Sequence, residues 1–240
     1  MRLAVIPARG GSKRVPRKNI RAFCGRPMIG WSLEAARSSG CFDRIVVSTD
    51  DDEIAGIAQG FGALVPFRRP PELSDDHATS VAVVAHAVRW HVDNGFAPDA
   101  VCCLYPTAPF VRPEDLAAGL RLLVESGRDF AFPVTSYAFP IQRALRRDAS
   151  GGVAMLHPEH QITRSQDLEE AFHDAGLFYW GRPDPWLEER PIYGPASTTL
   201  LLPRHRVQDI DTPEDWRRAE FMFEAIRMAE SAEAGKEGTA

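Results

Sequence analysis

The sequence has few cysteines and no long apolar run. Its 240 residues include four cysteines, none with the CxxC or Cys/His spacing of a metal site, and Cys102 and Cys103 lie in an apolar stretch typical of a core. No apolar run approaches the roughly 20 residues that a membrane-spanning helix needs. The first predicted strand begins within three residues of Met1, which leaves no room for a signal peptide. We therefore expect a protein of the reducing cytoplasm that has no membrane partner.

The sequence also lacks an excess of positive charge. Its formal net charge is −5, whereas a protein that binds nucleic acid through many phosphates is expected to be basic. We therefore expect no nucleic-acid partner. Lysine and arginine are nevertheless concentrated in one short segment, residues 9–18. A local positive cluster in a mildly acidic protein indicates a small anionic ligand.

Residues 3–19, LAVIPARGGSKRVPRKN, combine a strand signal with a basic loop that contains two glycines. A short β-branched run ends at Pro7, and Gly10 and Gly11 follow among basic side chains. Glycines allow backbone amides to surround an anion, so the loop suits a polyphosphate. It is not a P-loop, because the lysine follows the serine, and not a dinucleotide fingerprint, because position 15 is valine. A solvated basic turn remains the alternative.

Beyond this loop the sequence alternates strand and helix patterns with short connections. Composition and length, 44% hydrophobic and 25% charged over 240 residues, suit one α/β domain. The predicted fold class is α/β, with a doubly wound, mostly parallel sheet and right-handed crossovers. Strands are expected at residues 3–6, 42–49, 63–67, 100–105, 130–135 and 197–202, and helices at 27–39, from 53, at 79–92, at 113–125 and at 213–229.

The pattern changes after residue 135. Helical periodicity disappears, and short strand-like runs at 142–147, 153–157 and 176–180 accompany a Gly-Gly turn. We interpret 136–192 as an inserted arm, 1–135 together with 193–229 as a nucleotide-binding domain, and 230–240 as a flexible tail. Because unpaired strand edges of such arms often pair across a two-fold axis, we expect a homodimer formed through the arm.

Two groups of acids are candidates for binding a cation. Asp209 and Asp211 alternate on one face of a predicted extended segment, opposite the basic loop. Mg²⁺ prefers oxygen and is usually held by one or two carboxylates together with substrate phosphates, so we expect this pair to bind Mg²⁺. The alternative is an acidic turn that caps the last helix, a role that Thr212 can fill. For the acids at 50–52, capping of the next helix is the favoured interpretation.

The motif ARGGSKRVPRKN, residues 8–19, resembles the signature of the cytidylyltransferases that activate acidic sugars with CTP, the CMP-sialic acid synthetase family. The resemblance implies a Rossmann-like nucleotidyltransferase in which the anomeric hydroxyl of the sugar attacks the α-phosphorus of CTP and pyrophosphate leaves. It also implies residue roles. The nucleotide-binding positions are Ala8, Arg9, Gly10 through its backbone amide, Ser12, Lys18, Asn19 and, for the cytosine base, Arg69 and Ser80. The catalytic positions are Arg9, Lys18 and Asp211, and the magnesium positions are Asp209 and Asp211.

The sugar is harder to assign. Where sialic acid synthetases usually carry Gln before Pro-Thr-Ser-Pro, this chain has Tyr105 before Pro-Thr-Ala-Pro, which disfavours N-acetylneuraminic acid. Residues 139–143 (FPIQR) and 173–180 (HDAGLFYW) instead resemble segments of the pseudaminic acid cytidylyltransferases, with Leu177 where that subfamily is expected to have Gln. The candidate sugar-binding residues are Tyr105, Thr107, Gln142, Arg143, His173, Asp174 and Tyr179.

Several alternatives stay open. The sugar substrate could instead be N-acetylneuraminic, legionaminic or 3-deoxy-octulosonic acid. His173 is either a general base or a structural hydrogen-bond donor. Because a fold does not determine a function, a nucleotide-sensing module without catalysis is the alternative outside the enzymes.

Overall fold

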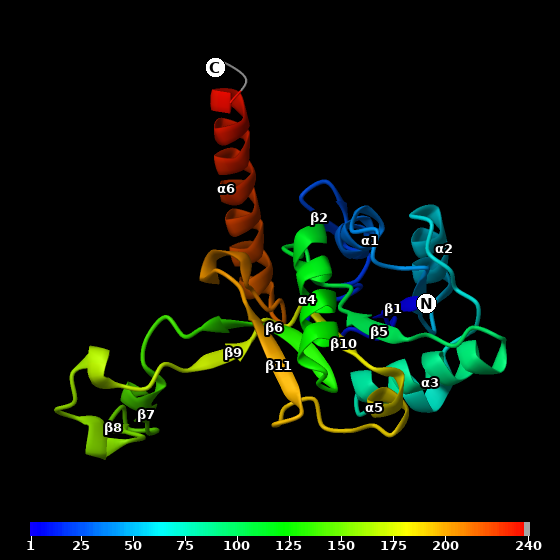
Figure 1. Cartoon of the computed structure of the whole chain (residues 1–240). Helices are drawn as coiled ribbons and strands as arrows, with labels where there is room; N and C mark the ends of the chain where they lie inside the picture. Colours follow the sequence, from blue (N-terminus) through cyan, green and yellow to red (C-terminus); the bar gives the residue numbers. More distant parts are fainter. Residues whose placement is uncertain (238–240) are drawn as a thin grey trace.

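The centre of the structure, a computed structural model that describes residues 1–237, is a seven-stranded sheet (Figure 1). Its strand order is β11 (Ser197–Leu201), β6 (Phe130–Ser136), β10 (Phe178–Gly181), β5 (Ala100–Leu104), β1 (Arg2–Pro7) and β4 (Arg44–Ser48), and β9 (Phe172–Asp174) pairs with β6 outside this path. All run in one direction except β9 and β10, which are antiparallel to their neighbours. The predicted α/β class with a mostly parallel sheet is confirmed.

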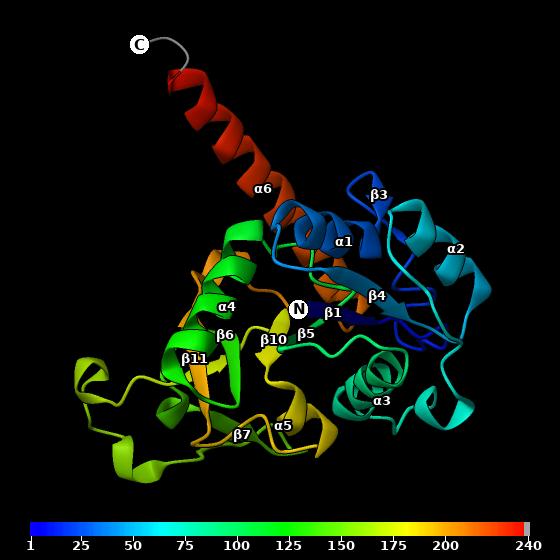
Figure 2. The ribbon, with the colours of Figure 1, turned by 45° about the vertical axis from the view of Figure 1, so that its right-hand side comes forward.

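Helices cover both faces of the sheet (Figure 2). On one face lie α1 (Met28–Ser38), α2 (Asp52–Gly60) and α4 (Pro113–Ser126), and on the other lie α3 (Ser80–Asp93) and α5 (Pro183–Leu187). Strand β1 shows how the sequence produces this arrangement. Ile6 packs in the core beneath α1, α2 and α4, whereas Leu3 and Val5 pack in the core beneath α3 and α5. Successive strand residues point to opposite faces, so the apolar run 3–6 of β1 contributes side chains to both cores.

The last helix, α6 (Pro213–Glu237), begins at a capping box and projects from the domain (Figure 1). The Thr212 amide donates to Asp215 Oδ2 at 2.8 Å, and the Asp215 amide donates to Thr212 Oγ1 at 3.2 Å. Trp216 and Phe223 anchor the first turns against the ring of Phe23. Residues 230–237, which the sequence assigns to a flexible tail, continue the helix, as suits an Ala- and Glu-rich stretch. Residues 238–240 lie outside the described residues.

No helix within residues 1–237 combines the length and the apolar character that crossing a membrane requires.

The strand predicted at 63–67 forms only a single bridge to β4. Leu64 donates to the carbonyl of Ile45 at 2.8 Å and accepts from the amide of Val47 at 2.9 Å. The ladder stops there because Pro66 has no N–H to continue it. The smaller elements are β2 (Ala22–Phe23) paired with β3 (Arg26–Pro27), and 3-10 helices at Pro71–Leu73, Ile141–Arg143, Pro158–His160, Ser165–Asp167 and Arg204–Arg206.

Residues 137–171, here called the arm, project from the sheet between β6 and β9 (Figure 1). The arm contains β7 (Leu145–Arg147) and β8 (Val153–Met155), which pair only with each other. The prediction that the inserted arm extends to 192 is wrong. β9 and β10 belong to the central sheet, and β10 lies between β5 and β6 with both of its faces buried.

Candidate active site

A cavity of about 520 Å³ opens at the carboxyl ends of β1 and β5. Four segments line it: the basic loop after β1, the segment that leads into α3, the turn after β5 and the segment before α6. Carboxyl ends of neighbouring parallel strands meet at one edge of a sheet, which brings these distant segments together. The lining residues are Pro7, Arg9, Ser12, Lys13, Arg14, Lys18, Asn19, Arg69, Asp76, Ala78, Ser80, Val83, Tyr105, Pro106, Thr107 and Asp211.

Lys18 and Asp211 meet in this cavity. The ammonium Nζ of Lys18 lies 3.4 Å from Asp211 Oδ1 and donates to the carbonyl of Ile210 at 2.7 Å. Arg14 approaches the other carboxylate oxygen, with 2.9 Å between Nη2 and Oδ2. The Lys18 side chain is only 18% exposed. The predicted convergence of the opening loop and the late acids is therefore confirmed as geometry.

Asp209 adds a second carboxylate beside Asp211, outside the cavity lining. The pKa of Asp209 is raised, first because surrounding protein atoms reduce its hydration and then because Asp211 repels a second negative charge. The segment 207–211 pairs with no strand, yet the expected alternation is present: Ile210 is fully buried, whereas Asp209 and Asp211 are not. Two carboxylates that repel each other suit a hard cation that neutralises both.

The described residues contain no group of three or more His, Cys, Asp or Glu side chains that could hold a metal ion. Mg²⁺ that binds with a nucleotide is usually held by one or two carboxylates, which share the coordination with the phosphates of the substrate. The carboxylates of Asp209 and Asp211 fit an ion held in this way.

At the other side of the cavity, Asp76 pairs with two cations of the basic loop. Arg9 Nη1 donates to Asp76 Oδ1 at 2.6 Å and to the carbonyl of Asp75 at 3.0 Å, and Lys13 contacts Asp76 Oδ2. Hydrogen bonds from Lys13 and Arg9 lower the pKa of Asp76 to about 2. Asp76 is not among the residues expected from the sequence, because acids just before a helix normally indicate a cap.

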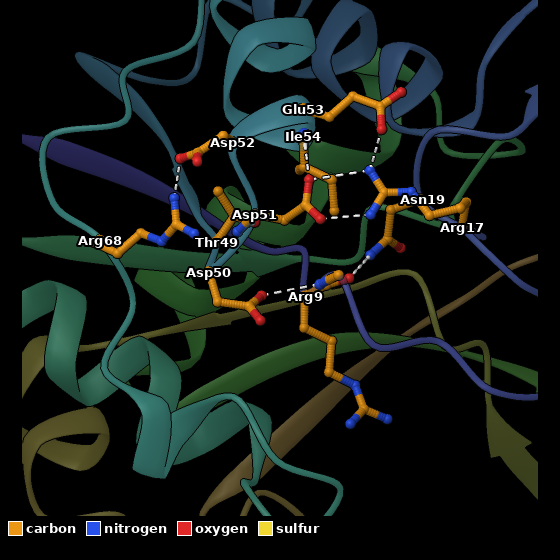
Figure 3. Close-up of polar contacts among 11 residues, drawn as sticks. Arg9, Arg17, Asn19, Thr49, Asp50, Asp51, Asp52, Glu53, Ile54 and Arg68 are labelled. Carbon is orange, nitrogen blue, oxygen red and sulfur yellow. Dashed lines mark hydrogen bonds and ion pairs between the residues drawn. The ribbon is translucent and has the colours of Figure 1, made fainter.

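The glycine end of the basic loop rests on the segment after β4 (Figure 3). The Gly10 amide donates to Asp50 Oδ1 at 2.9 Å, and Asn19 Nδ2 donates to the carbonyl of Arg9 at 2.9 Å. Ala8 is fully buried and its amide donates to Ser48. The Gly10 amide, which was predicted to bind a phosphate, thus donates to a carboxylate in this structure, and its contact with a phosphate stays a prediction. Ala8 and Gly10 lie outside the lining, whereas Ser12 and Asn19 belong to it.

Arg69 is a nearly buried cation that reaches the cavity without a carboxylate partner among its described hydrogen bonds. It is 4% exposed, and its guanidinium donates to Ser48 and, at 3.5 Å, to the carbonyl of Leu73. Burial lowers the pKa of Arg69 to about 10. Nearby, Ser80 Oγ lies 3.4 Å from the hydroxyl of Tyr105, whose pKa burial raises to about 12. This end of the cavity therefore combines hydrogen-bond donors with apolar surroundings. Such an environment suits a heterocyclic ring that carries hydrogen-bond acceptors.

Residues 3–226 match the sequence model of a family described as cytidylyltransferase. The chain belongs to the cytidylyltransferase family. It is accordingly a nucleotidyltransferase.

Curated relatives agree with this assignment over most of the chain. The pseudaminic acid cytidylyltransferase of Campylobacter jejuni is 45% identical over 221 residues, 92% of this chain and 95% of that protein. The CMP-N,N'-diacetyllegionaminic acid synthase of Legionella pneumophila is 32% identical, over 95% of this chain and 98% of that protein.

Solved structures show the same fold at low identity. CMP:2-keto-3-deoxy-manno-octonic acid synthetase, solved in complex with CTP, superposes with a TM-score of 0.67 at 18% identity, over 93% of this chain and 98% of that one. The 4-diphosphocytidyl-2C-methyl-D-erythritol synthase of Anaerococcus prevotii superposes with a TM-score of 0.62 at 12% identity, over 93% and 96%. The predicted Rossmann-like nucleotidyltransferase fold is confirmed.

Of the sugar-binding candidates, this cytidylyltransferase places only Tyr105 and Thr107 in the lining of the cavity. Gln142 and Arg143 instead hold the arm together, by donating to the carbonyls of Glu169 and Thr163. Neither residue lines the cavity in the single chain, and their contact with the sugar stays a prediction. The side-chain carbonyl oxygen of Gln142 is buried and accepts no hydrogen bond within the described residues.

The other three candidates form a second layer behind Tyr105. The ring of Tyr179 lies 5.4 Å from that of Tyr105, and its hydroxyl donates to Asp174, which also accepts from Tyr193 at 3.0 Å. Burial raises the pKa of Tyr179. His173 Nδ1 lies 2.9 Å from the carbonyl of Asp174. None of these three residues lines the cavity. Tyr179 packs against Tyr105, which does line it, and Asp174 in turn accepts the hydrogen bond from Tyr179.

Proposed function

We propose that the protein transfers the cytidylyl group of CTP to pseudaminic acid, which yields CMP-pseudaminic acid and pyrophosphate. The observation that carries the proposal is the meeting of Lys18 and Asp211 in a basic cavity of nucleotide size. The identity of 45% to a pseudaminic acid cytidylyltransferase, over 92% of the chain, supports the choice of sugar.

In this proposal the basic loop binds the triphosphate. Arg9, Ser12, Lys18 and Asn19 line one side of the cavity and supply donors for the phosphates and the ribose. Charge increases on the phosphoryl oxygens and on the departing pyrophosphate as the bond to the α-phosphorus breaks, so preorganised cations stabilise the transition state more than the ground state. Lys18 is the strongest candidate for this role, because its position is held by hydrogen bonds and partial burial.

Arg69 and Ser80 would bind the base. The guanidinium of Arg69 is buried against Ser48 and faces the cavity, where it can donate to the carbonyl oxygen and ring nitrogen of cytosine. A buried donor left without a partner costs about 1–3 kcal/mol, which penalises bases that offer no acceptor at this position.

Asp209 and Asp211 would hold Mg²⁺ together with the phosphates of the nucleotide. The ion would supply positive charge to the phosphoryl group and to pyrophosphate. Lys18 and Arg14 contact Asp211 directly, so these cations keep its carboxylate oriented toward the cavity.

The sugar would enter beside Tyr105 and Thr107, the lining residues that follow β5. We further propose that the protein is a homodimer formed through the arm, whose apolar side chains are exposed in the single chain. We place the reaction in the cytoplasm, because all four cysteines are free thiols.

The test is a panel of the four nucleoside triphosphates against purified pseudaminic, legionaminic, N-acetylneuraminic and 3-deoxy-octulosonic acids, with and without Mg²⁺. Pyrophosphate release and the mass of the product are measured. We expect turnover with CTP, pseudaminic acid and Mg²⁺, and kcat/KM at least tenfold lower for the other sugars. A preference for another sugar would contradict the substrate proposed, and CTP binding without turnover would identify a nucleotide-sensing module.

A further inference from the structure

Arg17, the residue before Lys18, has a backbone conformation that is unfavourable for any residue with a Cβ atom. Its φ is 55°, in the left-handed region. Arg17 also directs the chain: its carbonyl accepts from the amides of Ile20 at 3.0 Å and Arg21 at 2.9 Å. The conformation at residue 17 therefore sets the direction in which Lys18 leaves the turn, toward Ile210 and Asp211.

Ion pairs hold the Arg17 side chain (Figure 3). Its guanidinium donates to both oxygens of Asp51, at 2.5 and 3.0 Å, and to Glu53 at 2.5 Å. A two-point arginine–carboxylate pair fixes orientation as well as distance. The hydrogen bond from Arg17 lowers the pKa of Asp51 to about 2. Arg17 itself does not line the cavity.

Asp51 is in turn held rigidly by its own surroundings. Its Oδ1 accepts from the amide of Ile54 at 3.0 Å and so caps α2, while its own amide donates to Thr49 Oγ1 at 3.1 Å. It also lies against the start of the basic loop, because a Cβ added to Gly10 would meet Asp51 Oδ2 at 2.7 Å. Asp51 thus lies against the basic loop at Gly10 and pairs with it at Arg17.

We propose that Arg17 and Asp51 are positioning residues whose ion pair offsets the cost of the left-handed conformation at residue 17 and thereby places the Lys18 ammonium beside Asp211. The proposal rests on the proposed function, in which Lys18 acts on the triphosphate. A positively charged residue in this loop could be taken for a nucleotide ligand. In this proposal Arg17 instead supports the backbone conformation and does not bind the nucleotide.

Glycine and alanine at position 17 distinguish these roles. Arg17→Ala removes the ion pair but keeps the Cβ, so the left-handed conformation loses its support. Arg17→Gly also removes the ion pair, yet glycine adopts positive φ without steric cost. We expect kcat/KM for CTP to fall about tenfold in Arg17→Ala, because the energetic cost of the left-handed conformation for a residue with a Cβ atom corresponds to about that factor in rate. We expect Arg17→Gly to stay within about threefold of the wild type.

Asp51→Asn tests the other partner. Asparagine caps a helix as well as aspartate does, so α2 is preserved while the charge is lost. We expect Asp51→Asn to lower kcat/KM about as much as Arg17→Ala, and to have no further effect when combined with Arg17→Gly. Asp52→Asn is the matched control. Asp52 lies in the same helix turn and pairs with Arg68, and it makes no described hydrogen bond to the basic loop.

A second measurement does not depend on catalysis. Acylation of the Lys18 amine by a lysine-specific reagent, followed by mass spectrometry, should increase in Arg17→Ala and Asp51→Asn and stay at the wild-type level in Arg17→Gly and Asp52→Asn. Lys18→Ala defines the lower limit of activity, and thermal unfolding shows whether each variant is folded.

Equal losses in Arg17→Ala and Arg17→Gly would overturn the inference, because the side chain itself would then be required. Unchanged activity and labelling in Arg17→Ala would overturn it as well. If the wild type releases no pyrophosphate from CTP with any sugar, the proposed function fails, and the Lys18 labelling pattern still decides the inference.

Discussion

Asp76 places a negative charge among the cations that line the cavity. It contacts Arg9 and Lys13, which lie on the same basic loop as Lys18, and it is one of only two acidic residues in the described lining, the other being Asp211. A phosphate that enters the cavity has to compete with the Asp76 carboxylate for both cations. Asp76 therefore opposes nucleotide binding unless the segment that carries it moves away.

We predict that Asp76→Asn binds CTP more tightly. The two ion pairs are partly exposed and such pairs contribute little to stability, so the Kd for CTP should fall only about two- to fivefold. Titration calorimetry at low ionic strength measures the effect. Asp75→Asn is the matched control, because its side chain accepts only from the amides of His77 and Ala78 and asparagine can form the same turn. Weaker binding by Asp76→Asn would mean that Asp76 contacts the nucleotide or its cation.

The parts of the site differ in how well the sequence predicts them. Lys18 and Asp211 could be predicted to meet, because apolar runs reveal where strands end and ligand sites gather at those ends. Asp76 could not, because acids before a helix normally indicate a cap, and its partner Arg9 lies 67 positions away. The place of Gln142 was also unpredictable, because a local motif does not reveal that the arm folds back on its own carbonyls.

Strand β10 shows the corresponding limit for the sheet. Its residues alternate between the two cores, with Phe178 and Trp180 in one and Tyr179 in the other, so a strand is predictable from the pattern. Its neighbours are not. β10 follows the arm in sequence and yet pairs antiparallel with both β5 and β6. The apolar pattern of a strand does not reveal which other strands it pairs with. The sequence therefore suggested an arm strand, and the structure places it in the core.

A glycine on the neighbouring helix accommodates the aromatic side chains of β10. A Cβ at Gly119 of α4 would lie 2.7 Å from Phe178 Cε2 and 2.9 Å from Trp180 Cδ1. Helix propensity favours alanine over glycine by about 1 kcal/mol, whereas overpacking a core costs about 1–3 kcal/mol. Both rings are fully buried and the helix backbone is fixed, so the steric cost should dominate.

We predict that Gly119→Ala lowers the free energy of unfolding by about 1 kcal/mol, equivalent to a decrease in Tm of about 2–4 °C for a chain of this size. Gly56→Ala is the matched control. Gly56 lies within α2, is exposed, and has nothing within 4 Å of an added Cβ, so alanine should stabilise the protein by about 0.5–1 kcal/mol. Thermal and urea unfolding of both variants measure the difference. A stabilised Gly119→Ala would show that α4 can move away from β10.

The molecule as a whole has two projections, the arm and the end of α6 (Figures 1 and 2). The arm carries exposed apolar side chains, including Ile162 at 94% and Phe139 at 82% exposure. Its only strands are β7 and β8, which form a hairpin with three residues in each strand. An isolated two-stranded hairpin is marginally stable in water. The arm therefore needs a surface against which to pack, and in the proposed homodimer a second copy of the chain would supply one with the same apolar residues.

We predict that Phe139→Asp with Ile162→Asp converts the proposed homodimer to a monomer. A charge at each position would have to be desolvated in a packed interface, which costs several kcal/mol, whereas in a monomeric arm both positions face water. Sedimentation velocity at micromolar concentration measures the change, and circular dichroism shows whether the sheet domain is intact. Phe221→Asp is the matched control, because Phe221 is 76% exposed but lies on α6. If the arm variant remains a dimer, or if Phe221→Asp dissociates it equally, the interface lies on another surface and the apolar residues of the arm serve another purpose.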